Sequence, residues 1–120
     1  MLMVSPADET DWVPCDAQPD EWDVAVGMDR LNRSITIDID RPARTWAGLR
    51  SFVVDRAPVI GFDTQAPSFF WLAGFGGFGV QTSPAYSRMA AGLINGEPLS
   101  DDMEALRELV APDRPNLNRD

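Results

Sequence analysis

The sequence contains no lysine and no histidine, and it has only one cysteine in 120 residues. These residues therefore supply no Schiff-base amine, no imidazole base and no histidine-rich metal site. The single thiol, Cys15, cannot form a disulfide within the chain, so no secretory disulfide framework is indicated. The missing residue types exclude several common kinds of catalytic and metal-binding site.

Positive charge is also scarce, because ten arginines face nineteen acidic residues and the net charge is −9. Nucleic-acid partners need clustered positive charge, so we expect no nucleic acid to bind. No apolar run approaches the roughly 18 residues that span a bilayer, and the first residues lack the basic region of a signal peptide. We therefore expect no transmembrane segment and a cytoplasmic location.

The sequence pattern of the first 44 residues is typical of an antiparallel structure with one face in water. The apolar start, residues 1–4, predicts the end of a strand. An apolar stripe of period 3.6 behind Pro19 predicts a helix from about Pro19 to Asn32. Alternation from Ile35 to Ile39 then predicts a half-buried strand.

After Arg44 the sequence becomes more apolar and richer in glycine. Strands are predicted at residues 46–54 and 59–62, and the apolar run 69–73 predicts a central strand of a parallel sheet covered on both faces. A helical stripe then extends from Tyr86 to Ile94 and ends at Gly96. We also expect a short helix over about 100–110 and a frayed tail from Pro112.

The most informative feature is the glycine-rich segment 74–79, which lies between a predicted strand and a predicted helix. Four glycines in six positions allow the backbone to approach a ligand closely. The helix that follows presents free N–H groups and a positive dipole end, which would stabilise an anionic or electron-rich ring edge. Two interpretations remain open at this point: a ligand-binding turn, or a tight turn without a ligand.

Arg50 is the second candidate, because it stands among small and apolar residues in a predicted strand. A buried arginine keeps its charge and needs a partner, and its planar fork fits a carboxylate through two hydrogen bonds. That partner could be a substrate carboxylate or one of the acidic residues of the chain, and the pattern alone does not choose between them.

Three ordered motifs resemble the C-terminal region of the FAD-dependent D-amino-acid oxidase/dehydrogenase superfamily, and most closely the bacterial D-arginine/D-amino-acid dehydrogenases. The opening residues 2–10 and 16–19 also resemble the end of that family's substrate domain, so the likeness covers essentially the whole chain. The motifs are TWAGLR at 45–50, PVIG at 58–61 and FWLAGFGGFGVQTSP at 70–84.

The resemblance implies an α+β or α/β fold that is the C-terminal part of a two-domain FAD-linked oxidoreductase. Residues 1–44 would belong to the antiparallel substrate-binding domain. Residues 45–120 would belong to the glutathione-reductase-like FAD-binding domain. The N-terminal Rossmann unit, which anchors the FAD pyrophosphate, is expected to lie outside these residues.

The resemblance also implies roles for individual residues. Arg50 falls where the family has the arginine that pairs with the substrate α-carboxylate. Gly77 falls where a backbone carbonyl of the family contacts the substrate amine. Phe75 and Phe78 depart from the Gln and Tyr that are usual in close relatives, which puts substrate choice and flavin tuning in doubt. The positions that would line the flavin are Gly76, Gly79, Val80, Gln81 and Thr82.

The resemblance implies that the chain is part of an FAD-dependent oxidoreductase. Such an enzyme oxidises D-amino acids, or related amines, to imino and then 2-oxo acids by hydride transfer to the flavin. We expect that the chain alone holds no FAD and is inactive without the Rossmann half or a partner subunit. The alternatives are one subunit of a split flavin dehydrogenase and a non-catalytic truncated remnant or interaction protein.

Overall fold

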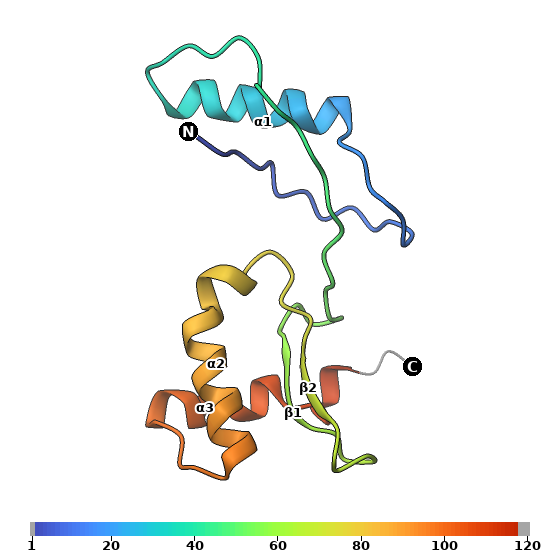
Figure 1. The fold of residues 1–120 in the computed structure, drawn as a ribbon, viewed down its shortest axis with the longest axis vertical. Helices are drawn as coiled ribbons and strands as arrows, with labels where there is room; N and C mark the ends of the chain where they lie inside the picture. The colour runs from blue at the N-terminus through green and yellow to red at the C-terminus, as the bar shows by residue number, and fades with distance from the viewer. Residues whose placement is uncertain (1, 118–120) are drawn as a thin grey trace. The chain divides into compact units, whose positions relative to one another are not determined.

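The computed structural model describes residues 2–117, which form two compact units divided between residues 49 and 50. The first unit contains one helix, α1 (Glu21–Ser34). The second contains a β-hairpin and helices (Figure 1). No helix among the described residues is long and apolar enough to cross a membrane.

Helix α1 begins where the sequence supplies a cap. The Asp20 carboxylate accepts hydrogen bonds from the backbone N–H groups of Trp22, at 2.8 Å, and Asp23, at 3.4 Å. These bonds satisfy amide groups that the first turn of a helix leaves without partners. Arg33 in the last turn pairs with Asp29 one turn earlier, at 3.0 Å. The helix predicted over about 19–32 is confirmed.

The segment before α1 packs on the helix without forming a strand. Pro6 lies against Gly27, the buried position of the helix, and the Arg30 side chain donates a hydrogen bond of 2.8 Å to the Pro6 carbonyl. The strand predicted at the start of the chain is absent from the described residues 2–4. A strand needs a partner for its backbone groups, whereas the contacts of this segment with α1 are made by Pro6 and the side chains of residues 2–4 are exposed.

The strand predicted from Ile35 to Ile39 is also wrong. The side-chain amide of Asn32 donates to the Ile39 carbonyl and accepts from the Ile39 N–H, at 3.2 and 3.4 Å. This pair of bonds folds the segment back on the end of α1 in place of a β-ladder, and Ile37 stays exposed. Alternation therefore indicated a strand where no strand partner is present in the described part of this unit.

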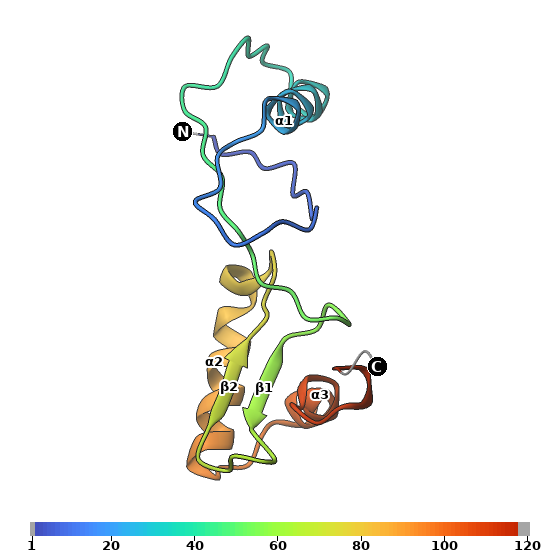
Figure 2. The same cartoon turned by 90° about the vertical axis from the view of Figure 1, so that its right-hand side faces the viewer.

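The second unit is organised around a hairpin of β1 (Val59–Phe62) and β2 (Phe70–Ala73). The strands are antiparallel, with Val59 opposite Ala73 and Phe62 opposite Phe70 (Figure 2). The predicted segments are therefore strands, but the parallel sheet is not present among the described residues. β2 is not a buried central strand either, because Trp71 and Leu72 are 38% and 49% exposed.

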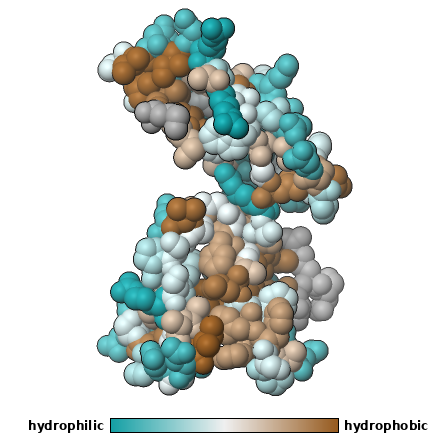
Figure 3. All heavy atoms as spheres, viewed as in Figure 1, coloured by the Kyte–Doolittle hydropathy of each residue, from teal (hydrophilic) through white to brown (hydrophobic). Residues whose placement is uncertain are grey.

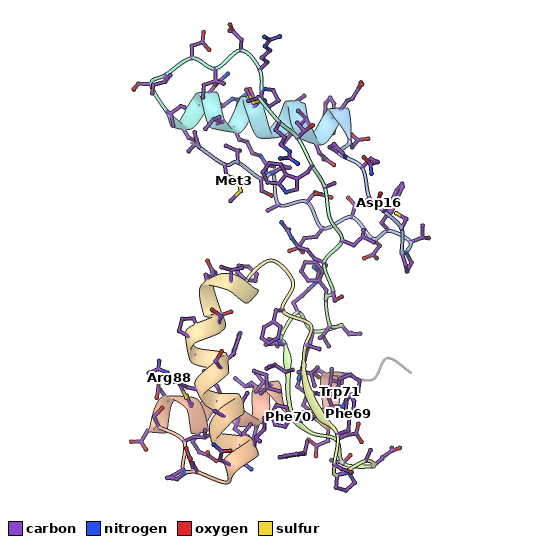
Figure 4. All side chains as sticks on the ribbon, in the orientation of Figure 1. Met3, Asp16, Phe69, Phe70, Trp71 and Arg88 are labelled. Carbon is purple, nitrogen blue, oxygen red and sulfur yellow. The ribbon has the colours of Figure 1, made fainter. Side chains whose placement is uncertain are left out.

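Asp63 shapes the loop that joins the two strands. Its carboxylate accepts from the N–H groups of Gln65 and Ala66, each at 2.8 Å, and from the indole N–H of Trp71 at 2.9 Å. The ring of Phe69 meets Trp71 edge-on at 4.9 Å (Figure 4). These hydrogen bonds hold the pKa of the Asp63 carboxyl below its ordinary value, with the Trp71 bond the largest cause.

Two helices complete this unit: α2 (Gly79–Asn95) and α3 (Asp101–Val110). Gly96 ends α2 in the left-handed conformation, at φ 67°, as the sequence predicts. Both helices contact β1, and apolar side chains gather between α2 and the hairpin (Figures 2 and 3). The buried core is made of Ile60, Met89, Ala90 and Val110.

The predicted strand at 46–54 is reduced to a single antiparallel bridge between Phe52 and Phe75. The tail beyond Pro112 was predicted to fray, and this is wrong for residues 112–117. Arg114 is only 7% exposed, and a short 3-10 helix, η1 (Pro115–Leu117), follows it. An ion pair distant in sequence holds this segment, whereas residues 118–120 lie outside the described part of the chain.

Candidate flavin and substrate site

Residues 50–53, here called the arginine segment, lie along the glycine turn, which is residues 74–79. The Gly76 N–H donates a hydrogen bond of 3.0 Å to the Ser51 carbonyl, and Phe52 bridges Phe75. Both segments belong to the second unit. The two motifs that the sequence analysis singled out are therefore neighbours in space.

Glycine is needed in the turn because side chains of the arginine segment fill the space where a Cβ would stand. At Gly76, where φ is 51°, a Cβ would come within 2.5 Å of the Phe52 ring. At Gly74, where φ is 74°, it would overlap the Val53 side chain. The glycines thus permit close packing of one segment on the other as well as a backbone conformation that other residues avoid.

We predict that Gly76→Ala will lower the free energy of unfolding by about 2 kcal/mol or more, through left-handed strain and overlap with Phe52. Gly77→Ala is the matched control, because its Cβ would meet only Arg50 at an ordinary 3.6 Å. Urea denaturation followed by circular dichroism measures both. Equal stability losses in the two variants would show that the Gly76 packing is not as described.

The Arg50 guanidinium lies beside Gly77, since its Nη1 atom would be 3.6 Å from a Cβ built there. Arg50 itself is exposed, so the burial expected from its apolar neighbours in sequence is wrong. The segment does not enter a sheet beyond the Phe52 bridge, which explains the exposure. No carboxylate in residues 2–117 pairs with Arg50, so the structural ion pair considered above is not formed there.

Helix α2 begins at Gly79, directly behind the glycine turn. Its N-cap is Phe78, which forms no capping bond through its side chain, and the first turn contains no acidic residue. The first bond of the ladder runs from the Thr82 N–H to the Phe78 carbonyl, at 3.1 Å. The amides of Gly79, Val80 and Gln81 therefore carry the positive end of the helix dipole without an acceptor in the described chain.

A proline inside α2 does not break the helix. Pro84 cannot donate to the Val80 carbonyl, but the Ser83 hydroxyl donates to that oxygen at 2.9 Å. The Thr82 hydroxyl likewise donates to the Phe78 carbonyl at 2.6 Å. Side-chain hydroxyls thus stabilise the first turns, and the helix starts seven residues before the stripe that the sequence showed from Tyr86.

A shallow, mostly apolar groove of about 280 Å³ lies beside the start of α2. One wall is formed by Phe75 and Tyr86, whose ring centres are 5.1 Å apart. Sequence reasoning did not assign Tyr86 to this groove, because its spacing marked it only as a core position. The groove is lined by Leu72, Phe75, Gly79, Ser83, Tyr86 and Ser87.

Gly74, Gly76 and Gly79 also meet the Gly-x-Gly-x-x-Gly spacing of a dinucleotide-binding turn, and β2 and α2 flank them as such a turn requires. The topology differs, however. β2 pairs antiparallel with β1, and no parallel strand follows α2 in the described chain. The glycine turn is therefore not part of a Rossmann βαβ unit in this structure.

A strand, a glycine turn and a helix start without a side-chain cap, beside an arginine that has no acidic partner in the described part of the chain, form the kind of site that accepts electron-rich groups. The family model described as FAD dependent oxidoreductase (DAO) matches residues 2–93. The chain therefore belongs to the family of FAD-dependent oxidoreductases. The described residues contain no cluster of acidic, histidine or cysteine side chains that could hold a metal ion.

The described residues fit the part of FAD that the family would place here. Within residues 2–117 the amides of Gly79, Val80 and Gln81 have no acceptor, and Gly77 is exposed and carries no side chain, whereas Phe52 fills the side of Gly76. Such a surface can approach a flat ring closely and donate hydrogen bonds to its oxygen and nitrogen edge. No comparable cradle for the pyrophosphate is formed by the described residues, because the turn lacks a parallel βαβ context.

Proposed function

We propose that this chain contributes the C-terminal part of an FAD-dependent oxidoreductase that oxidises D-amino acids, or related amines with a free carboxylate. The observation that carries the proposal is the Arg50 guanidinium, which has no acidic partner among residues 2–117 and lies beside Gly77, at the turn that opens α2. Arg50, which would bind an acid group, and the amide-rich start of α2, which would face a flavin, then belong to the same compact unit. The family match supports the flavin part of the proposal.

The chain's own residues would bind and orient the reactants. Arg50 would hold the substrate carboxylate through two charge-assisted hydrogen bonds, and the Gly77 carbonyl would accept a hydrogen bond from the substrate amine. Gly76 and Gly79 would border the ring through their backbone, since Phe52 and Phe75 occupy the sides where their Cβ atoms would stand. The free amides of Val80 and Gln81 would stabilise negative charge on the ring, and Thr82, whose N–H donates to the Phe78 carbonyl, would complete the same turn of α2. When bound, FAD supplies the acceptor for the substrate hydride.

The hairpin favours a partner that supplies the remaining part of the FAD domain. Among the described residues β2 pairs with β1 alone, and the side chains of Trp71, Leu72 and the preceding Phe69 are exposed. Isolated two-stranded sheets are marginal in water, and a free edge offers backbone groups for another strand. We therefore propose that a Rossmann half, from a longer polypeptide or from a partner subunit, covers this surface.

We predict that the 120-residue chain alone will purify without flavin, because the glycine turn provides no anchor for the pyrophosphate. Absorbance of the purified chain after incubation with excess FAD and gel filtration measures retention. The chain should acquire flavin and dye-linked D-amino-acid oxidation only when it is co-expressed with a Rossmann half of this family.

Gly76→Ala in the same co-expression is the matched test of the turn, because it alters the packing that shapes the proposed flavin surface. Gly77→Ala serves as the milder comparison. A stoichiometric flavin on the isolated chain would refute the expected division of labour. Flavin retention without any amine oxidation in the assembled protein would reject the proposed substrate class.

A further inference from the structure

The segment that follows α3 returns to the entrance of the hairpin and is fixed there by one side chain (Figures 1 and 2). Arg114 forms a two-pronged pair with Asp55, from Nε to Oδ2 at 2.7 Å and from Nη2 to Oδ1 at 2.9 Å. The two residues are 59 positions apart in the sequence. The Arg114 side chain is 6% exposed and that of Asp55 is 18% exposed, so this pair, here called the clamp, is well shielded from water.

Every N–H of the Arg114 guanidinium has an acceptor in the described chain. Besides Asp55, it donates to the carbonyls of Ala57 at 2.8 Å, Pro58 at 3.0 Å and Ala111 at 3.0 Å. A guanidinium has five N–H groups, and all five are used. The clamp therefore fixes the backbone of residues 55–58 as well as the Asp55 side chain.

A short turn, residues 53–56, connects the clamp to the arginine segment. The Arg56 N–H donates to the Val53 carbonyl at 2.9 Å, and Arg56 has the left-handed φ of 64°. The Arg56 guanidinium lies over the Phe52 ring, 4.7 Å from its centre. A non-glycine residue holds such a φ only where the surrounding contacts determine it, and the clamp acts on the residue before it.

The other end of the same path is the glycine turn. Phe52 packs where Gly76 has no side chain, Val53 packs at Gly74, and the Gly76 N–H binds the Ser51 carbonyl. Residues 50–57 contain no helix and no strand, apart from the Phe52 bridge. Contacts at the clamp and at the glycine turn therefore hold both ends of this segment.

We infer that Asp55 and Arg114 are positioning residues, which hold the arginine segment on the glycine turn and so keep Arg50 beside Gly77. The role of Arg50 in this inference rests on the proposed function. The geometry of the clamp does not depend on that proposal. A segment without its own secondary structure would otherwise sample many conformations, and Arg50 would lose its fixed place. The C-terminal segment is in this sense a part of the site, although it touches neither Arg50 nor Gly77 in the described contacts.

Hydrogen exchange followed by mass spectrometry on the 120-residue chain tests the inference. Arg114→Lys keeps the charge but cannot form the two-pronged pair, so it is milder than Asp55→Asn, which could unfold the unit. We expect exchange of residues 74–77 to accelerate about tenfold in Arg114→Lys, as the Gly76 bond opens more often. Exchange over residues 86–93 of α2 should change much less, because the clamp does not contact them.

Arg107→Met is the matched control, since Arg107 lies on α3 and makes only an exposed pair with Glu104. It should leave exchange at residues 74–77 unchanged. Equal acceleration at 74–77 and 86–93 in Arg114→Lys would mean that the clamp is merely structural, and unchanged exchange at 74–77 would mean that it does not reach the turn. Either result overturns the inference.

The exchange measurement needs neither flavin nor substrate, so its outcome is separate from that of the proposed function. In an assembled oxidase, Arg114→Lys should also raise KM for a carboxylate substrate and leave KM for the matching amine without a carboxylate unchanged. Accelerated exchange at 74–77 without this difference would support the clamp and reject the carboxylate role of Arg50.

Discussion

Asp55→Asn is expected to lower the free energy of unfolding by about 3–5 kcal/mol, because it leaves the Arg114 guanidinium shielded from water without its counter-ion. Arginine does not lose its proton to relieve such a cost. Chemical denaturation in urea, followed by circular dichroism, measures the change. This loss is a large fraction of the total stability of a small unit.

The matched control for this prediction is Glu104→Gln, which removes the acidic partner of an exposed pair on α3. That pair is half open to solvent on both sides and should contribute about 0–1 kcal/mol. If Asp55→Asn were no more destabilising than Glu104→Gln, the clamp would not be the buried pair described above.

The pH dependence of the same comparison follows from Asp55. Hydrogen bonds from Arg114 are the main cause that lowers the pKa of its carboxyl from 3.8 to about 2. A depressed pKa stabilises the folded state above the unfolded value, and that contribution is lost as the pH falls from about 4 towards 2. The stability difference between the native chain and Asp55→Asn should therefore be constant from neutral pH to about pH 5 and shrink below pH 4.

Arg50→Met is expected to raise KM for a D-amino acid by about tenfold to a hundredfold in the assembled oxidase, with a smaller effect on kcat. The estimate follows from about 1.5–3 kcal/mol for a hydrogen bond to a charged group, since each 1.4 kcal/mol corresponds to a factor of ten. Steady-state kinetics with a dye acceptor provide the measurement. The matching amine, which has no carboxylate, should show little change in KM.

Arg88→Met controls for the removal of one positive charge from the same unit. Arg88 projects from α2 away from the hairpin, and its Nε donates to the Pro84 carbonyl (Figure 4). It should leave KM unchanged. An unaltered KM in Arg50→Met, or an equal increase for the amine, would remove Arg50 from carboxylate recognition.

The helices could be predicted from the sequence because their signals are local. Pro19 before the first helix, the stripe from Tyr86 to Ile94 and Gly96 at the end of α2 each act within a few residues. The strand predictions at 35–39 and 46–54 failed for the opposite reason. A strand depends on a partner that the pattern does not specify, and Asn32 or the glycine turn took that role.

The sequence was enough to name candidate residues for the site, but it did not specify how they are arranged. Arg50 and the glycine turn were identified from residue type and from the family resemblance, and the structure brings them together. The exposure of Arg50 was not foreseen, because its apolar neighbours in sequence suggested burial. The Asp55–Arg114 pair was missed altogether, since ordinary composition in a polar tail gives no local sign of a contact 59 residues away.

The match to the family ends at residue 93, two residues before the end of α2, whereas the architecture described above continues. Val110 completes the apolar interior, Pro112 packs against Gly61, and Arg114 ties the chain down. A domain boundary drawn where the likeness stops would therefore sever a helix and discard the fastening of the hairpin. The segment that matches the family and the segment that folds as a compact unit therefore end at different residues, and only the compact unit contains both Asp55 and Arg114.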